Sequence, residues 1–255
     1  MACNMSNNHI LIIDQLDASY TELLQSIGCQ FDYRPKITRA EIIALTTQYV
    51  GLIVRSKTVI DEELLGGQKD LKFIARAGAG IDQLDVSYLE SRQIDILNAP
   101  EGNRDALGEH VVGMLLSLSN KLRKGDQEVR DRIWDREGNR GFEIAGKTVG
   151  LLGYGFMGSG VAEKLAGFGC RVIAYDKYKS NYGDLYAEEV SLEDVFAQAD
   201  IFSLHIPLTD ESQNMVDLTF LKRFKKNIVF INAARGEIVP LADLNKALDQ
   251  GIPSG

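Results

Sequence analysis

The first hundred residues alternate between short apolar runs and longer segments in which apolar residues recur at helical spacing. The strand-like runs are HILIID, QFDYRP, GLIVRS, LKFIARAG and IDILNAP, and the segments between them include ASYTELLQSIG and TRAEIIALTTQ. Short apolar strands separated by helices are typical of βα units, whose strands form parallel sheets. The pattern therefore predicts an α/β domain with five parallel strands over residues 1–100.

A second alternating region follows a long helix and a polar arm. The helix is expected between Asn103 and Lys124. Its apolar side is formed by Leu107, Val111, Met114, Leu115 and Leu118. The arm covers residues 125–146, and beyond it TVGLL, RVIAY, DIFSL and NIVFI have the pattern of strands. We therefore predict two domains, 1–100 and 101–255, with the linking helix (103–124) and the arm in the second.

The segment TVGLLGYGFMGSGVAEKLAGFGCRVIAYD carries the most specific pattern. Gly153, Gly155 and Gly158 form G-x-G-x-x-G directly after an apolar strand. An amphipathic helix follows, Gly169 ends it, and the next strand ends at an acid, Asp176. With the acid about 20 residues after the first glycine, this context is the fingerprint of a dinucleotide-binding Rossmann unit. The alternative is a glycine-rich turn in an α/β protein that binds no cofactor.

Each residue type in this unit has a physical reason. Gly153 permits a tight turn, Gly155 leaves room for a pyrophosphate beside the backbone, and Gly158 lets the helix pack close to the strand. Free N–H groups at the helix start then face the anion. The Asp176 carboxylate can accept hydrogen bonds from both ribose hydroxyls, and its charge repels a 2′-phosphate. The predicted cofactor is therefore NAD rather than NADP.

Composition narrows the possible partners. The chain has 255 residues, 45% of them hydrophobic, and a net charge of −8 without any basic stretch, which disfavours nucleic acid and anionic membranes. Cys3, Cys29 and Cys170 are far apart and lack C-x-x-C spacing, so neither a disulfide framework nor a metal site is expected. The start has no signal-peptide pattern, and no apolar stretch reaches the ~18–20 residues of a membrane helix. We expect a cytoplasmic protein.

Four further segments occur in the order that a known family shows. RAGAGIDQLD and NAPEGN lie in the first half, and SLHIPLT and NAARGEIV follow strands of the second. Together with the glycine-rich unit, they make the chain resemble the D-isomer-specific 2-hydroxyacid dehydrogenases along essentially its whole length. IVRSKT beside RAGAGID is most similar to the D-3-phosphoglycerate dehydrogenase branch, with hydroxypyruvate and glyoxylate reductases next. The resemblance implies a flavodoxin-like substrate domain and an NAD-binding Rossmann domain that is incomplete at its C-terminus.

The resemblance also implies roles for residues of the second half. Arg235 matches the catalytic arginine, whose planar guanidinium clamps the substrate carboxylate and polarises the reacting oxygen. The alternative is a surface arginine at a strand end. The expected cofactor contacts are Gly153, Tyr154, Gly155, Phe156, Met157, Gly158, Asp176, His205, Ile206, Pro207, Ala233, Ala234 and Arg235.

Two loops of the first half are expected to hold the substrate, a small 2-hydroxy or 2-oxo acid. They follow the third and fourth strands, and parallel sheets build their sites at the carboxyl ends of strands. The predicted contacts are Arg55, Ser56, Arg76, Ala77, Gly78 and Ala79. The glycines at 78 and 80 let N–H groups approach a carboxylate, and Arg55 and Lys57 are candidates for a phosphate. The alternative, a solvated basic loop, is strongest for Lys57 because lysines are mostly exposed.

The histidines do not supply an obvious proton donor. Histidine is the usual group because its pKa lies near neutrality, and the chain has only His9, His110 and His205. In the resembled family the catalytic histidine lies well after the AARG motif, with its glutamate between them, so His205 matches a cofactor-proximal position instead. His110 fits a packing role in the long helix, and Glu237 does not match the family's glutamate. The resemblance therefore implies that the catalytic pair lies beyond residue 255.

The leading interpretation is NAD-dependent oxidation of a D-2-hydroxyacid, with 3-phosphoglycerate, at the start of serine synthesis, as the favoured substrate. The chain is expected to be either a fragment of a longer enzyme or a naturally shortened product. An alternative of another class is an NAD(H)-binding interaction protein without turnover. A homodimer is expected because the long helix and the arm resemble the family's dimer-forming elements. Trp134 on that arm is either an interface residue or a locally packed tryptophan.

Overall fold

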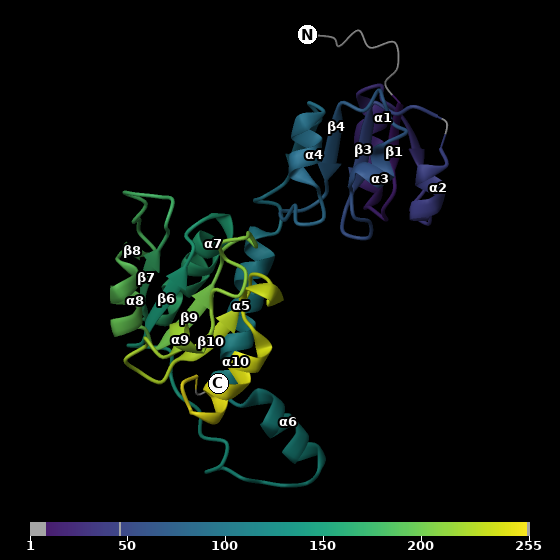
Figure 1. Cartoon of the computed structure of the whole chain (residues 1–255). Helices are drawn as coiled ribbons and strands as arrows, with labels where there is room; N and C mark the ends of the chain where they lie inside the picture. Colours follow the sequence, from purple (N-terminus) through teal and green to yellow (C-terminus); the bar gives the residue numbers. More distant parts are fainter. Residues whose placement is uncertain (1–8, 46, 254–255) are drawn as a thin grey trace. The chain divides into compact units, whose positions relative to one another are not determined.

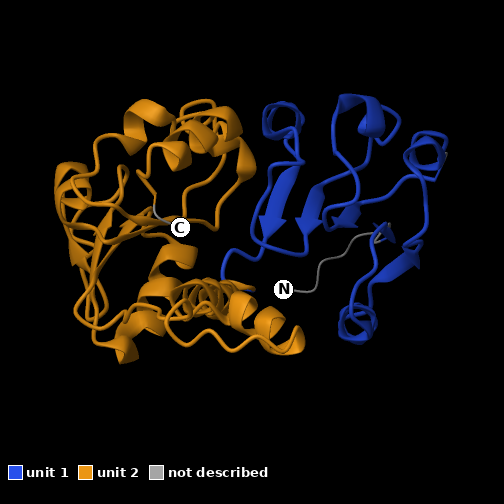
Figure 2. Cartoon of the chain, turned by 90° about the horizontal axis from the view of Figure 1, so that it is seen from below, with its two compact units in different colours: residues 1–102 blue, residues 103–255 orange. Residues whose placement is uncertain are grey.

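The computed structural model describes residues 9–45 and 47–253. The chain divides into two compact units, residues 1–102 and 103–255, which Figure 2 colours separately. Each unit is built around its own five-stranded sheet (Figure 1), and every strand pair in both sheets is parallel. The predicted fold class, two Rossmann-like parallel-sheet α/β domains, is therefore confirmed.

Unit 1 contains the five strands predicted from the alternation, joined by four helices. In chain order the elements are β1 (His9–Ile12), α1 (Ala18–Ser26), β2 (Gln30–Tyr33), α2 (Arg39–Ile43), β3 (Gly51–Val54), α3 (Glu62–Leu65), β4 (Phe73–Arg76), α4 (Val86–Ser91) and β5 (Asp95–Asn98). The sheet order is β2-β1-β3-β4-β5. This is the 2-1-3-4-5 order of flavodoxin-like folds, so the first half has the topology that the resemblance implied.

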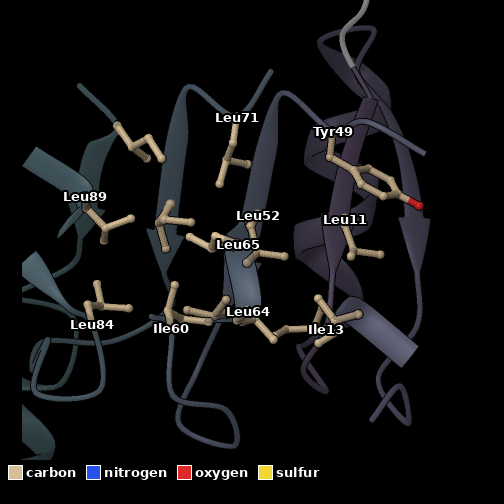
Figure 3. Close-up of a cluster of buried hydrophobic side chains, with 14 of the residues drawn as sticks. Leu11, Ile13, Tyr49, Leu52, Ile60, Leu64, Leu65, Leu71, Leu84 and Leu89 are labelled. Carbon is tan, nitrogen blue, oxygen red and sulfur yellow. The ribbon is translucent and has the colours of Figure 1, made fainter. Parts of the chain in front are cut away.

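The core of unit 1 lies mainly on one face of its sheet. Alternate strand residues such as Leu11 and Leu52 point to this face, where they meet Leu64 and Leu65 of α3 and Leu89 of α4 (Figure 3). All five side chains are at most 3% exposed. The opposite face, which α1 covers, has a smaller buried cluster consisting of Ile10, Ile12, Val50 and Ile53. No residue of α1 itself is buried, so the two faces are covered unequally.

Unit 2 contains the four predicted strands and one short strand that was not predicted. Its elements are α5 (Arg104–Ser119), α6 (Leu122–Arg130), β6 (Thr148–Leu152), α7 (Phe156–Leu165), η1 (Ala166–Phe168), β7 (Arg171–Tyr175), β8 (Glu188–Glu189), α8 (Leu192–Gln198), β9 (Ile201–Leu204), α9 (Leu218–Leu221), β10 (Val229–Asn232), η2 (Gly236–Ile238) and α10 (Leu241–Asp249). The order β10-β9-β6-β7-β8 corresponds to 5-4-1-2-3 of the Rossmann fold. β8 was missed because two exposed glutamates carry no hydrophobic pattern.

The prediction of one helix from Asn103 to Lys124 was wrong. α5 ends at Ser119, Lys121 adopts left-handed backbone angles (φ 52°, ψ 36°), and a second helix, α6, begins at Leu122. The arm returns to the break between α5 and α6, where Phe142 N donates a hydrogen bond to Ser119 O at 3.0 Å. α6 has no buried residue and carries ion pairs at helical spacing, such as Lys124–Glu128. Its charge pattern supports an exposed helix but gives no hydrophobic signal.

The side of α5 that was predicted to be apolar is buried only in part. Val111 and Leu115 are buried against the sheet of unit 2, but Met114 and Leu118 are 37% and 43% exposed. The buried face is displaced toward Gly108, where α5 crosses α7 closely. A Cβ atom at Gly108 would lie 3.0 Å from the carbonyl oxygen of Gly160, so both helices need small residues at the crossing.

The remaining composition-based expectations concern thiols and the membrane. Cys29 and Cys170 are free thiols, and Cys3 lies outside the described residues. Within the described ranges, no helix combines the length and the apolar character that a bilayer crossing requires. Nor do these residues include a group of three or more His, Cys, Asp or Glu side chains that could hold a metal ion.

Candidate functional site

The candidate site of unit 2 lies where three neighbouring strands end. β6 pairs with β9 on one side and β7 on the other, and all three run in the same direction. Gly153 follows β6, Asp176 follows β7 and His205 follows β9, so the chain brings three predicted residues to one edge of the sheet. The strand order reverses between β6 and β9, and open α/β sheets bind ligands at such a switch point.

The glycine-rich turn has the geometry that a pyrophosphate requires. Gly153 has φ +95°, and a Cβ there would lie 2.6 Å from the His205 carbonyl oxygen, so only glycine fits. A Cβ at Gly158 would lie 2.1 Å from the Gly153 carbonyl oxygen. Gly155, in contrast, has no atom within 4 Å of its Cβ position, so space is open beside the backbone. α7 begins at the next residue without a side-chain cap, which leaves its first N–H groups free for an anion.

Asp176 is held by the backbone around it. Its two carboxylate oxygens accept hydrogen bonds from Tyr154 N at 2.9 Å and from Tyr178 N at 3.0 Å. Its own N–H donates to Tyr182 Oη at 2.9 Å, and that hydroxyl donates to Ala174 O at 2.9 Å. Each carboxylate oxygen has further lone pairs, so the side chain can still accept bonds from ribose hydroxyls.

Tyr154, a predicted cofactor contact, points into the protein. Its side chain is 4% exposed, and its hydroxyl donates to Asp184 Oδ1 at 2.9 Å. Burial, reinforced by this bond, raises the pKa of Tyr154 above its usual range. Lys179 Nζ donates to the Tyr154 carbonyl oxygen at 2.7 Å. Only the backbone of Tyr154 is therefore part of the turn's surface.

A cavity of about 290 Å³, called the edge cavity below, opens beside the turn. Among the predicted cofactor residues it is lined by Gly153, Gly155, Asp176, His205, Ile206 and Pro207. Residues that the prediction did not include complete the lining, namely Leu152, Tyr175, Lys177, Tyr178, Leu192, Thr209, Glu211, Ser212, Met215 and Phe220. The lining is mostly apolar, and its two carboxylates are Asp176 and Glu211. Phe156 and Met157, in the first turn of α7, are not part of this lining.

His205 is buried at the floor of the edge cavity. Its Nε2 lies 2.9 Å from Ser203 Oγ, and its Nδ1 has no hydrogen-bond partner among the described residues. Burial lowers the pKa of His205 to about 4. The ring is therefore neutral at physiological pH, which agrees with a role beside the cofactor and weighs against a role as general acid.

Arg235 lies in a turn that follows β10, the strand next to β9. The turn is held by Asn232, whose side-chain oxygen accepts from Ala234 N at 3.0 Å and whose amide donates to Arg235 O at 2.9 Å. The Arg235 guanidinium is half-buried and donates to Ala234 O at 2.8 Å. Ala233 and Ala234 pack on the core of unit 2. The arginine thus stands at the same carboxyl edge as the glycine turn.

In unit 1, the two predicted substrate loops lie side by side because β3 and β4 pair, with Val54 opposite Arg76. Arg76 Nε donates to the Arg55 carbonyl oxygen at 3.2 Å, and the buried Asp14 accepts from Arg55 N at 2.5 Å. A Cβ at Gly78, where φ is +152°, would lie 1.7 Å from Arg76 Nη1, so the glycine makes room for the guanidinium.

The other residues of these two substrate loops differ in their exposure and in their hydrogen bonds. The side chains of Arg55 and Ser56 are exposed, and Ala77 and Ala79 are half-buried. Lys57, the second phosphate candidate, donates to three carbonyl oxygens, those of Ile13, Pro35 and Ile37, at 2.6 to 3.0 Å. An ammonium has three donors, so Lys57 serves the fold rather than an anion in this structure.

Comparison with known proteins shows to which family this chain belongs. Residues 112–255 match the family model described as the D-isomer specific 2-hydroxyacid dehydrogenase, NAD binding domain. The chain belongs to this family. It therefore carries an NAD-binding domain, as the glycine turn and the edge cavity indicate.

Relatives and solved structures extend the likeness over nearly the whole chain. A D-3-phosphoglycerate dehydrogenase of Mycobacterium bovis is 37% identical over 251 residues, covering 97% of this chain and 47% of the relative. A hydroxypyruvate reductase of Thermotoga maritima is 30% identical over 251 residues, covering 98% of this chain and 80% of the relative. The structure of an acyclic imino acid reductase with NADPH and D-Arg has a TM-score of 0.86 at 26% identity. The match covers 97% of this chain and 81% of the reductase chain. The chain spans about half the length of most of the curated relatives that it matches best.

In this NAD-binding domain, several residues of the site carried no recognisable signal in the sequence. Tyr182, Asp184 and Lys179 hold Asp176 and the turn from a loop with no regular pattern. Asn232 could have been found, because an asparagine at a strand end often bonds to the backbone two residues on.

Proposed function

We propose that this protein oxidises a D-2-hydroxyacid to the 2-oxoacid with NAD as acceptor, and that 3-phosphoglycerate is the substrate. The single observation that carries the proposal is the carboxyl edge of unit 2, where an anion-binding glycine turn, a ribose acid and an arginine follow adjacent strands. When bound, NAD supplies the redox chemistry by accepting hydride from C2 of the substrate.

Each residue of unit 2 has a defined task in this proposal. The N–H groups at the start of α7 hold the pyrophosphate beside Gly155, and Asp176 accepts bonds from the ribose hydroxyls. Arg235 binds the substrate carboxylate and stabilises negative charge on the reacting oxygen, because its guanidinium presents parallel donors. Neutral, buried His205 fills the floor of the edge cavity without charge.

The substrate loops of unit 1 support a phosphorylated acid through Arg55 and Arg76. Lys57 already bonds three carbonyls, so Arg55 is the exposed cation left in its loop for a phosphate, while Arg76 and the backbone at Gly78 serve the carboxylate. If no phosphate is bound, hydroxypyruvate or glyoxylate becomes the better substrate, in keeping with the hydroxypyruvate reductase among the relatives.

The test measures cofactor binding and turnover separately. NADH fluorescence should rise on titration into this protein, and NADPH should bind more weakly because Asp176 repels the 2′-phosphate. Turnover should then be followed as NAD reduction, with D-3-phosphoglycerate and unphosphorylated D-glycerate compared in the complete polypeptide that carries these residues. Equal kcat/KM for the two acids would remove the phosphate from the proposal, and absent NADH binding would remove the cofactor site.

A second function, an NAD(H)-binding protein without turnover, is favoured by the histidines. His205 is neutral and buried, His9 lies 3.3 Å from Asp32 in unit 1, and His110 is on the exposed side of α5. Among the described residues, none of the three histidines pairs with a glutamate. NADH binding combined with absent turnover on every D-2-hydroxyacid tested would support this function.

We further propose a homodimer that forms through the outer face of α5 together with α6 and the arm. A groove of about 870 Å³ lies on this face and is lined by Met114, Leu118 and residues of α6. Trp134 is 85% exposed, so it does not pack locally, and Leu122, Val129 and Ile133 are also more than half exposed. Apolar side chains left in water in this way mark interaction surfaces. Sedimentation velocity should give a dimer, and Leu118→Asp should give a monomer that still binds NADH.

A further inference from the structure

One ionic contact joins the two loops that flank the glycine turn. β7 and β9 lie on either side of β6, so the loops that follow them pass on either side of Gly153. Lys177 of the first loop pairs with Glu211 of the second, and Tyr178 Oη donates to the other carboxylate oxygen of Glu211. All three side chains line the edge cavity together with Asp176.

Glu211 lies in a turn that hydrogen bonds close on either side of it. Ser212 is 5% exposed, its Oγ donates to Pro207 O at 2.7 Å, and it accepts from Thr209 N at 2.8 Å. The bonds from Lys177 and Tyr178 lower the pKa of Glu211, so it is an anion at neutral pH. The side chains of Lys177 and Glu211 are 55% and 49% exposed, so an incoming anion can reach this pair.

We propose that Glu211 is a second determinant of cofactor choice, because it occupies the Lys177 ammonium that a 2′-phosphate would otherwise bind. In dinucleotide-binding folds the acid after the second strand takes the ribose hydroxyls, and a nearby cation accommodates the 2′-phosphate of NADP. Here a cation stands one residue after Asp176 but is already paired. A 2′-phosphate therefore meets two carboxylates, and the lysine next to Asp176 in the sequence is already paired with one of them. This inference deepens the proposed NAD preference and rests on it.

The test compares variants of Glu211, Asp176 and Lys177 by fluorescence titration with NADH and NADPH. Glu211→Gln should tighten NADPH binding by about three- to tenfold, because the ammonium is released while one negative charge is removed. Its NADH affinity should change less than its NADPH affinity, since only NADPH carries the 2′-phosphate that Lys177 would bind. Asp176→Ser combined with Glu211→Gln should favour NADPH by more than the product of the single effects, because the two residues act on one phosphate.

Two controls test whether the change in NADPH affinity comes from the Lys177–Glu211 pair or only from the change in net charge. Glu188→Gln makes the same change in net charge but breaks a pair with Arg171 at the amino end of β7, so both affinities should stay within about twofold of wild type. Adding Lys177→Ala to Glu211→Gln should abolish the gain in NADPH affinity. An equal gain in the Glu188 and Glu211 variants, or a gain that survives loss of Lys177, overturns the inference. Failure of the wild type to bind NADH would instead count against the proposed function.

Discussion

Each of the two sheets has five strands that are all parallel to one another, yet the residues at their carboxyl edges differ. In unit 2 the strands end in a glycine turn, an acid and a cavity, which suit a long ligand with a pyrophosphate. In unit 1 they end in an exposed arginine, in a second arginine packed against Gly78, and in a lysine that donates to backbone carbonyl oxygens. Sheet topology therefore fixes where a site forms, and the residues after each strand decide what it binds.

The units also differ in how their sheets are covered. In unit 2 both faces carry large buried clusters, whereas in unit 1 the face under α1 has four buried residues. Leu23 of α1 and Ile27, which follows the helix, are 63% and 65% exposed, and Leu97 of β5 is 53% exposed. Unit 1 therefore buries less apolar surface on that face, and we expect it to open at lower denaturant concentration than unit 2.

The largest expected effect comes from the glycine turn of unit 2. Gly158→Ala should abolish NADH binding and destabilise the unit by at least about 1–3 kcal/mol, because its Cβ would meet the Gly153 carbonyl oxygen at 2.1 Å. Gly155→Ala is the matched variant, since its Cβ would meet no protein atom within 4 Å. It should weaken NADH binding while leaving the melting temperature unchanged. A stable Gly158→Ala protein that binds NADH normally would contradict the assigned geometry of the turn.

The next effect depends on pH and belongs to unit 2 alone. Burial lowers the pKa of His205 from 6.5 to about 4, so between these values the unfolded chain binds more protons than the folded one. The His205 contribution is therefore fully present above about pH 6.5 and is lost as the pH falls toward 4, with a total of about 3 kcal/mol. The check is the free energy of unfolding at pH 4 to 8 for wild type and His205→Asn. The variant should lose stability less steeply on acidification, and parallel curves would show that His205 is not buried as described.

The fold and the glycine-rich turn could be predicted from the sequence. Features that depend on contacts between segments distant in the sequence could not. The strand pattern and the glycine spacing are local, so β6, α7 and the end of β7 were predicted correctly. The break at Lys121 was missed because it depends on Phe142, which returns from twenty residues further on to bond Ser119 O. The hydrogen bonds of Lys57 could not be foreseen for a similar reason, since its carbonyl partners lie in segments distant in sequence. Whether the site residues serve the predicted ligands stays a prediction.

A smaller effect separates the two basic residues of the unit 1 loop. Lys57→Met should destabilise unit 1 by about 1–3 kcal/mol, because three carbonyl oxygens lose a charged donor. Arg55→Ala, with its exposed side chain, should leave unfolding unchanged and raise KM for a phosphorylated substrate about ten- to a hundredfold. Denaturant unfolding and steady-state kinetics distinguish the two roles. The reverse result, with Arg55 structural and Lys57 affecting only KM, would exchange the assignments.

The smallest effects come from a pair of matching helix starts, one in each unit. Thr38 caps α2 and Ser191 caps α8, and each forms a capping box with the acid three residues later. Replacing either with alanine should cost about 1 kcal/mol, because the helix loses the acceptor for one N–H group. Hydrogen exchange should locate each loss: Thr38→Ala should speed exchange within unit 1 and Ser191→Ala within unit 2. If the units open independently, the unit 1 variant should shift only the transition at lower denaturant concentration. Should Thr38→Ala speed exchange in both units equally, the chain would be opening as one cooperative body, and the difference in face coverage would not set the order of unfolding.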